Sequence, residues 1–170
     1  YFIIPDELKQ LKNSMKVLAS ETFSAVSAPI QFAAITAFND DHGNYVSNSR
    51  KILKGIGEYV YKNLKSNNVI INKPMGGFYL MPEFLNKKFK TSQEMCADLL
   101  NKKGVAMLPG SDFGFLNDKM IARISYTDFD GKHFMSNINS DTIVDENLIK
   151  KFAPKVVEGT KRLKDWVKKG

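Results

Sequence analysis

Cysteine is nearly absent from this sequence, and long apolar runs are missing altogether. The single cysteine, Cys96, excludes a disulfide within the chain and fits a reducing compartment, so we expect a cytoplasmic protein. No apolar run approaches the ~20 residues that a membrane-spanning helix needs, which argues against a membrane partner. The two histidines, His42 and His133, are far apart and lack the spacing of metal ligands, so we expect no metal site.

Acidic residues are also fewer than basic ones. The chain carries 25 Lys and Arg against 18 Asp and Glu, a net charge of +7. An excess of this kind occurs in proteins that bind nucleic acids. Here, however, the lysines are spread along predicted helical faces and mixed with acids, as in residues 161–165, and no basic stripe alternates with stacking aromatic residues. We therefore expect a solvated surface and no nucleic-acid partner.

Apolar residues are plentiful enough for a domain with a real core. They make up 43% of the 170 residues, and they alternate between two kinds of spacing. Helical spacing occurs after Pro5, through 30–38 and 46–64, after 91, and near the C-terminus. Short runs typical of strands occur near 69–72, 77–82, 105–108 and 121–126. The sequence predicts an α/β fold in which a small, mostly antiparallel sheet packs with helices.

The predicted helix at 30–38 is apolar nearly all round. A helix of this kind is buried, either in a core or in a contact between subunits.

An arginine stands in the middle of the apolar segment 120–127, Met-Ile-Ala-Arg-Ile-Ser-Tyr-Thr. In a strand, Arg123 shares a face with residues 121 and 125. Burying a bare charge costs several kcal/mol, so Arg123 must meet an anion or reach water. The turn-rich stretch at 109–114, Pro-Gly-Ser-Asp-Phe-Gly, precedes this strand. Two interpretations follow: a socket for a carboxylate, or a core strand whose arginine pairs with a neighbouring aspartate.

Three motifs occur in order along the chain: Pro-Met-Gly-Gly-Phe-Tyr-Leu at 74–80, the stretch 99–114 that ends in Pro-Gly-Ser-Asp-Phe-Gly, and Ala-Arg-Ile-Ser at 122–125. With the final helix, they resemble the C-terminal part of class I/II aminotransferases, the fold-type I enzymes that use pyridoxal 5'-phosphate. The resemblance covers most of the chain. It implies that residues 1–41 are the end of the cofactor-binding domain with connecting and interface helices, and that residues 42–170 are the small C-terminal domain.

The resemblance also assigns roles to individual residues. It implies that Arg123 binds the α-carboxylate of the substrate, because a planar guanidinium offers two parallel hydrogen bonds to a carboxylate. Ser24 and Ser27 fall where the family presents a residue to the cofactor phosphate of the neighbouring subunit. Simple helix capping is the alternative for these two hydroxyl groups. The glycines and proline of 109–114 match a loop beside the substrate, where they give shape rather than chemistry.

The activity implied by the resemblance is the transfer of an amino group from an amino acid to a 2-oxo acid by a homodimer. Two alternatives stay open: a lyase or synthase with the same cofactor and fold, or a non-enzymatic α/β binding or dimerisation module. The family's catalytic lysine lies in a Ser-Lys motif followed by Gly-x-Arg, and neither occurs in this chain; residues 49–55 are only superficially similar. Because the chain begins with Tyr1 rather than Met, we expect a fragment of a longer enzyme.

The first prediction is that this 170-residue chain does not catalyse transamination alone. The lysine motif and most of the cofactor contacts lie upstream of Tyr1 if the resemblance holds, and the lysines present sit mostly on solvated faces, where an amine stays protonated. A titration with pyridoxal 5'-phosphate should show no stoichiometric, amino-acid-sensitive absorbance band. Binding of one cofactor per chain, with conversion of an amino acid to its oxo acid, would contradict this.

Overall fold

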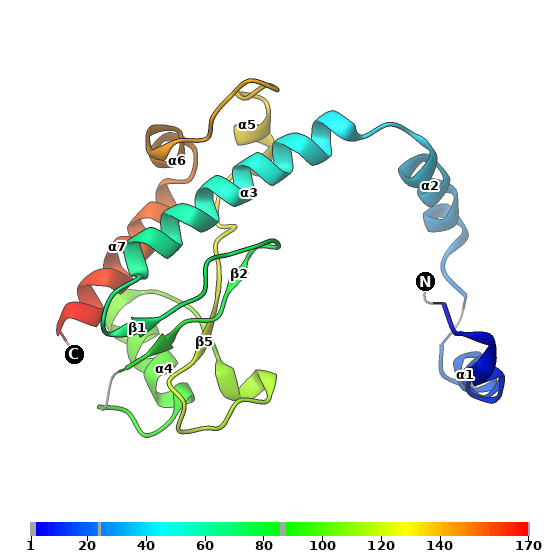
Figure 1. Ribbon diagram of the computed structural model, residues 1–170, viewed down its shortest axis with the longest axis horizontal. Coiled ribbons are helices and arrows are strands. Elements are labelled where there is room, and N and C mark those ends of the chain that lie inside the picture. The colour runs from blue at the N-terminus through cyan, green and yellow to red at the C-terminus, as the bar shows by residue number, and fades with distance from the viewer. Residues whose placement is uncertain (1–2, 24, 86–87, 170) are drawn as a thin grey trace. The chain divides into compact units, whose positions relative to one another are not determined.

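The computed structural model describes residues 3–23, 25–85 and 88–169. These divide into two compact units, one that ends at His42 and one that begins at Gly43. The first unit contains the short 3-10 helix η1 (Asp6–Leu8) and the helices α1 (Lys9–Thr22) and α2 (Ala28–Asn39), which Figure 1 shows in blue.

The predicted apolar helix at 30–38 is confirmed as α2, which has Pro29 in its first turn. Its large side chains are nevertheless exposed: 60% for Ile30, 72% for Phe32 and 78% for Phe38. No residue described in η1, α1 or α2 is buried. A core within this unit therefore does not cover the apolar surface of α2, and the contact between subunits stays a prediction.

The second unit combines helices with short strands (Figure 1). Its elements, in chain order, are α3 (Gly43–Leu64), β1 (Val69–Ile70), β2 (Tyr79–Leu80), β3 (Glu83–Phe84), α4 (Ser92–Lys103), β4 (Leu108–Pro109), the 3-10 helix η2 (Gly110–Phe113), β5 (Ala122–Ser125), α5 (Gly131–Met135), α6 (Glu146–Phe152) and α7 (Pro154–Lys169). No helix in the described part of the chain combines the length and the apolar character that crossing a membrane requires.

The strands of the described residues form two small sheets, and every pairing is antiparallel. One sheet pairs β1 with β3, and the other has the order β2-β5-β4. A bridge between Glu83 and Ile121 connects the two. The predicted α/β fold with a small antiparallel sheet is thus confirmed. The predicted strand at 105–108 is largely wrong, however, because pairing begins only at Leu108.

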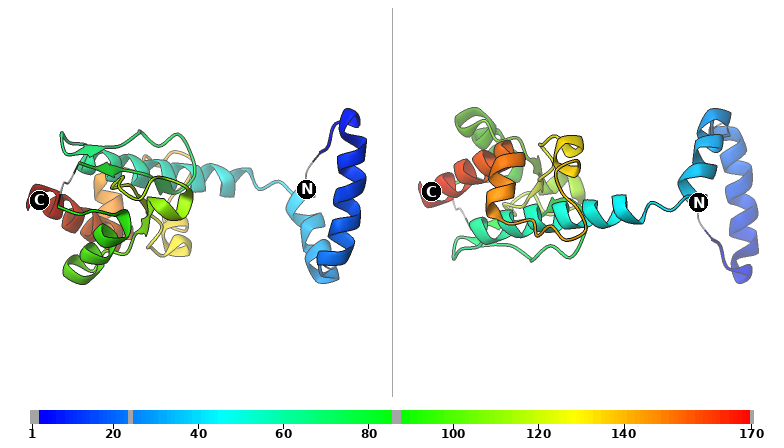
Figure 2. Two further views of the ribbon diagram at one scale, coloured as in Figure 1. Left: turned by 90° about the horizontal axis from the view of Figure 1, so that it is seen from below. Right: turned by 90° about the horizontal axis from the view of Figure 1, so that it is seen from above.

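Helices α3 and α7 pack side by side, and the further views in Figure 2 show α7 in red beside the teal part of α3. Their buried faces carry Ile56 and Val60 from α3 and Leu163 from α7. Trp166 lies in the core at 7% exposure, three residues after Leu163 and therefore on the same face of α7. Its ring stacks on Phe89, with ring centres 6.0 Å apart.

Residues 129–142 show no helical spacing, yet they contain the short helix α5. The Asp130 carboxylate accepts a hydrogen bond from the His133 backbone N–H at 2.9 Å and so caps its first turn. Phe134 is fully buried and stacks on Phe152, with ring centres 5.0 Å apart. One buried ring in a five-residue helix anchors the segment without producing a period that the sequence could reveal.

A tyrosine joins α3, β5 and the turn before β2. The Tyr126 hydroxyl donates a hydrogen bond to the Gly77 carbonyl oxygen at 2.9 Å, and its side chain is 2% exposed. A Cβ on Gly57 would lie 2.9 Å from the same hydroxyl, so a glycine is needed where α3 passes this ring. Gly77 itself has a φ of +67°, in the left-handed region that favours glycine. Burial raises the pKa of Tyr126 above its ordinary value.

The second prediction concerns this tyrosine. Tyr126→Phe should lower the free energy of unfolding by about 1 kcal/mol at neutral pH, because the hydrogen bond to Gly77 is lost. Since the folded-state pKa of Tyr126 lies above its unfolded value, the corresponding stability is complete below about pH 10 and is lost as the pH rises through the folded-state pKa. Urea titrations between pH 7 and 11 measure both effects.

Tyr61→Phe is the matched control, because no hydrogen bond of the Tyr61 hydroxyl occurs in the described residues. It should leave the free energy of unfolding at pH 7 nearly unchanged. Identical alkaline destabilisation in the Tyr126→Phe variant and in the original chain would contradict the assignment.

Candidate functional site

Arg123 lies on β5, the central strand of the three-stranded sheet. The strand is paired on both sides, with Arg123 opposite Leu108 of β4 and Ile124 opposite Leu80 of β2. Ala122 beside it is fully buried, whereas Arg123 itself is half-buried. A strand held by two neighbours gives Arg123 a rigid backbone, and partial exposure leaves its guanidinium within reach of a ligand.

Two aromatic rings flank the guanidinium of Arg123. Its Cζ lies 4.3 Å from the centre of the Tyr79 ring and 4.4 Å from the centre of the Phe113 ring, both within the range of a cation–π interaction. Among the described residues, no carboxylate oxygen lies within 4.0 Å of the Arg123 nitrogens. The interpretation in which Arg123 pairs with a neighbouring aspartate is therefore not what the structure shows.

The loop that carries Phe113 depends on two glycines. The Gly110 backbone N–H donates to the Ile121 carbonyl oxygen at 2.7 Å, and a Cβ on Gly110 would lie 2.8 Å from the Ile121 Cβ. Gly114, with a φ of +85°, ends η2 in the left-handed region. These residues press the loop against the start of β5 and so bring Phe113 to Arg123. Their part is shape, as the sequence predicts for this loop.

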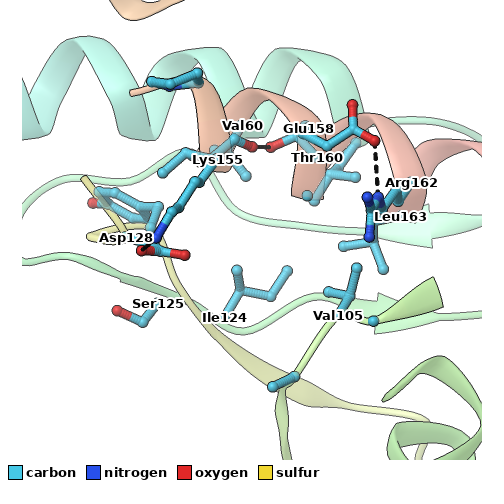
Figure 3. A pocket seen from close by; sticks show the side chains of 17 residues that line it. Val60, Val105, Ile124, Ser125, Asp128, Lys155, Glu158, Thr160, Arg162 and Leu163 are labelled. Atoms are coloured by element: carbon cyan, nitrogen blue, oxygen red, sulfur yellow. Dashed lines mark hydrogen bonds and ion pairs between the residues drawn. The ribbon is translucent and has the colours of Figure 1, made fainter. Parts of the chain in front are cut away.

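A separate cavity of about 560 Å³ lies where α7 and α3 meet β5. Figure 3 shows aliphatic side chains along it and ion pairs at its rim: Val60, Val105, Ile124 and Leu163 are aliphatic, and the pairs are Asp128 with Lys155 and Glu158 with Arg162. The nitrogen–oxygen distances of these pairs are 3.5 and 2.8 Å. Arg123 does not line the cavity, and the charged residues at the rim are already paired with each other. The carboxylate binding predicted for Arg123 therefore does not involve this cavity.

The two serines predicted beside the cofactor phosphate are in the first unit. Ser24 lies outside the described residues. Ser27 is exposed and occupies the N-cap position of α2, but its hydroxyl makes no capping hydrogen bond. The backbone of Ser27 instead accepts from the Ile30 and Gln31 N–H groups. Its side chain is thus not used by the helix, whose N-terminus is a favourable position for an anion.

The other candidates do not form a site. Cys96 is buried, and burial together with the nearby Asp112 carboxylate raises the pKa of its thiol to about 11, which keeps it protonated and unreactive at neutral pH. The exposed His42 ring contacts the Thr36 carbonyl oxygen at 3.4 Å, and the His133 ring packs edge-on against Phe152. No group of three or more potential metal ligands occurs in the described part of the chain.

Sequence reasoning missed the two rings that flank Arg123. Tyr79 ends the Gly-Gly-Phe-Tyr segment and Phe113 stands beside Gly114, so both belong to motifs that the sequence singled out for other reasons. A hint was available in the predicted antiparallel sheet, because an aromatic residue diagonal to an arginine on a paired strand lies within its reach. The register needed to apply it comes only from the structure.

Comparison with known proteins gives a consistent answer. A family model described as "Aminotransferase class I and II" matches residues 1–136. The aspartate aminotransferase of Bacillus sp. (strain YM-2) is 35% identical over 107 residues, which cover 60% of this chain and 27% of that protein. The aspartate aminotransferase of Sulfolobus acidocaldarius is 26% identical over 159 residues, 90% of this chain and 33% of that protein. The chain thus spans a third or less of the length of these relatives.

Solved structures show the same fold. An alanine aminotransferase from Pyrococcus furiosus aligns with a TM-score of 0.72 at 22% identity, over 97% of this chain and 36% of that one. The aspartate aminotransferase from Rhizobium meliloti aligns with a TM-score of 0.65 at 22% identity, over 94% of this chain and 36% of that one. At these identities the likeness concerns the fold.

The third prediction tests the loop beside Arg123. Gly110→Ala should lower the free energy of unfolding by about 1–3 kcal/mol, because the new methyl group overlaps Ile121 and the loop must move. Gly76→Ala is the matched control, since no atom lies within 4 Å of a Cβ built there. Urea titration of both variants measures the difference. Equal stability of the two variants would show that the loop is not packed against β5 as described.

Proposed function

Because this chain belongs to the aminotransferase class I and II family, we propose that the whole protein transfers an amino group from an amino acid to a 2-oxo acid with the help of pyridoxal 5'-phosphate. The resemblance inferred from the three motifs is confirmed at the level of the family. We assign residues 42–170 to a small domain that binds substrate, and residues 1–41 to the end of a cofactor-binding domain with interface helices.

The observation that carries this proposal is the state of Arg123. Its guanidinium is half-buried, is flanked by aromatic rings and has no carboxylate partner among the described residues. A guanidinium in this environment retains its charge and attracts an anion, and its planar fork matches the two oxygens of a carboxylate. Arg123 would therefore bind the α-carboxylate of the amino acid and hold the substrate in one orientation.

The cofactor supplies an electron sink when it is bound, and the protein supplies binding and orientation. Of the described residues, Ser27 at the N-terminus of α2 suits a phosphate group, because its hydroxyl is not used for capping and the helix end favours negative charge. Ser24 is its second candidate partner. The proposal assigns no catalytic lysine to this chain.

Assembly into a homodimer would explain the exposed apolar side chains of α2. Ile30, Phe32 and Phe38 together expose a broad apolar surface on one short helix. Large apolar side chains exposed together on one helix are consistent with a contact with another protein. We propose a neighbouring subunit as this partner, because the proposed contact between Ser27 and the cofactor phosphate also crosses a boundary between subunits.

The cytoplasmic location stays a prediction.

The fourth prediction tests Arg123 in the full-length enzyme. Arg123→Lys should lower kcat/KM for the amino acid by roughly 10- to 100-fold, because lysine keeps the charge but cannot form the two parallel hydrogen bonds. The absorbance of the bound cofactor should not change. Steady-state kinetics and a cofactor titration measure the two effects.

Arg162→Lys is the matched control, because Arg162 is exposed and already bonded to Glu158 and to the Lys103 carbonyl oxygen. It should retain full kcat/KM. An unchanged kcat/KM in Arg123→Lys, or loss of the cofactor with it, would remove Arg123 from the substrate site.

A further inference from the structure

The register of the sheet brings Tyr79 to Arg123. Tyr79 of β2 lies directly opposite Ser125 of β5, and Arg123 is two residues from Ser125 on the same face of the strand. Diagonal neighbours in an antiparallel pair are within reach when one side chain is aromatic and the other is long. The 4.3 Å between the Arg123 Cζ and the Tyr79 ring centre is this diagonal contact.

The second ring comes from the opposite neighbour of β5. Leu108 of β4 pairs with Arg123, and the chain then turns through η2, which places Phe113 at 4.4 Å from the Arg123 Cζ. Tyr79 and Phe113 thus reach the same guanidinium from β2 and from the loop after β4. No ring contact joins these two residues in the described part of the chain, which indicates that the guanidinium separates them.

Neither ring is a core residue. Tyr79 is 43% exposed and Phe113 is 40% exposed, so packing in the interior does not account for their positions. Each has the guanidinium as a contact, and Tyr79 also has the Phe78 ring at 4.3 Å. Two half-exposed rings that contact one charged group are expected where the orientation of that group matters for binding a ligand.

A guanidinium carries all five of its N–H donors in its plane and none on its faces. The Tyr79 and Phe113 rings, whose centres lie 4.3 and 4.4 Å from the Arg123 Cζ, occupy space around the guanidinium and so limit the directions from which a ligand can reach its donors. They also restrict the side chain, so that it has less rotamer entropy left to lose when a ligand binds. A planar carboxylate that approaches edge-on meets two parallel donors, whereas a ligand that has to stack on the guanidinium competes with the two rings.

We infer that Tyr79 and Phe113 are positioning residues for Arg123, and that together they make this site selective for a carboxylate presented edge-on. The identity of the carboxylate as that of the amino acid substrate rests on the proposed function. The positioning of the guanidinium by the two rings does not rest on the proposed function. The positioning role and the proposed function can therefore be tested separately.

The fifth prediction uses the full-length enzyme and acetate as the probe, measured as a competitor of the amino acid. Tyr79→Leu and Phe113→Leu should each weaken acetate binding roughly two- to fivefold, and the double variant roughly five- to twentyfold. The inhibition constant of acetate and the KM for the amino acid should rise together, with a smaller change in kcat. Tyr79→Phe, which keeps the ring, should restore acetate binding.

A spectroscopic readout is independent of activity. Ring currents from Tyr79 and Phe113 should shift the NMR signal of the Arg123 side-chain N–H, which is assigned by its loss in Arg123→Lys. Each leucine variant should move this signal toward the position of an exposed arginine. Phe115→Leu is the matched control, because Phe115 is a 44% exposed aromatic residue of the same loop without a contact to the Arg123 guanidinium.

The outcomes separate the two ideas. If Arg123→Lys weakens acetate binding but both leucine variants behave like Phe115→Leu, the positioning role is overturned and the proposed function stands. If Arg123→Lys leaves acetate binding unchanged, Arg123 is not a carboxylate site and both are overturned. Weaker acetate binding in the leucine variants, with the shifted signal and rescue by Tyr79→Phe, supports the positioning role.

Discussion

The hydrogen bond from the Tyr126 hydroxyl to the Gly77 carbonyl oxygen joins two segments of the second unit that lie far apart in the chain. Tyr126 directly follows β5 and Gly77 shortly precedes β2, so the bond connects the ends of two strands that pair with each other. Gly57 allows α3 to pass close to the same ring. With that junction in place, Tyr79 pairs with Ser125, and its ring falls diagonal to Arg123. The hydrogen bond and the ring contact thus both lie along the pairing of β2 with β5.

Alternation along β5 lets one short strand serve two environments. Ile124 lines the cavity beside α7, whereas the neighbouring Arg123 stands between aromatic rings and does not line that cavity. The charges at the cavity rim are satisfied by each other, as in the pair of Glu158 with Arg162. Exposed pairs of this kind contribute little to stability and leave no charge for a ligand. No carboxylate of the described residues pairs with Arg123. Arg123 is therefore the charged group that is available to bind a ligand.

Local chemistry predicted the helices well. Thr91 caps α4 by accepting a hydrogen bond from the Glu94 N–H at 3.2 Å, and Gly104 ends the same helix with a φ of +62°; both are residue types typical of these helix positions. Strands and isolated anchors were predicted less well. Residues 105–107 are apolar but lie outside the sheet, and α5 has one buried ring and no period. A two-residue strand or a single buried ring is defined by its contacts with distant residues. Neither therefore produces a periodic spacing of apolar residues in the sequence.

The sequence by itself determined the α/β class, the family and the place of Arg123 on a short strand, because each of these is carried by residues close together in the chain. The environment of Arg123 was decided only by the tertiary structure. Tyr79 and Phe113 reach the guanidinium from opposite neighbours of β5, through a register and a glycine-shaped loop. Contacts between residues so far apart in the chain depend on how the strands align, and the Tyr126–Gly77 hydrogen bond lies at one end of the pairing between β2 and β5.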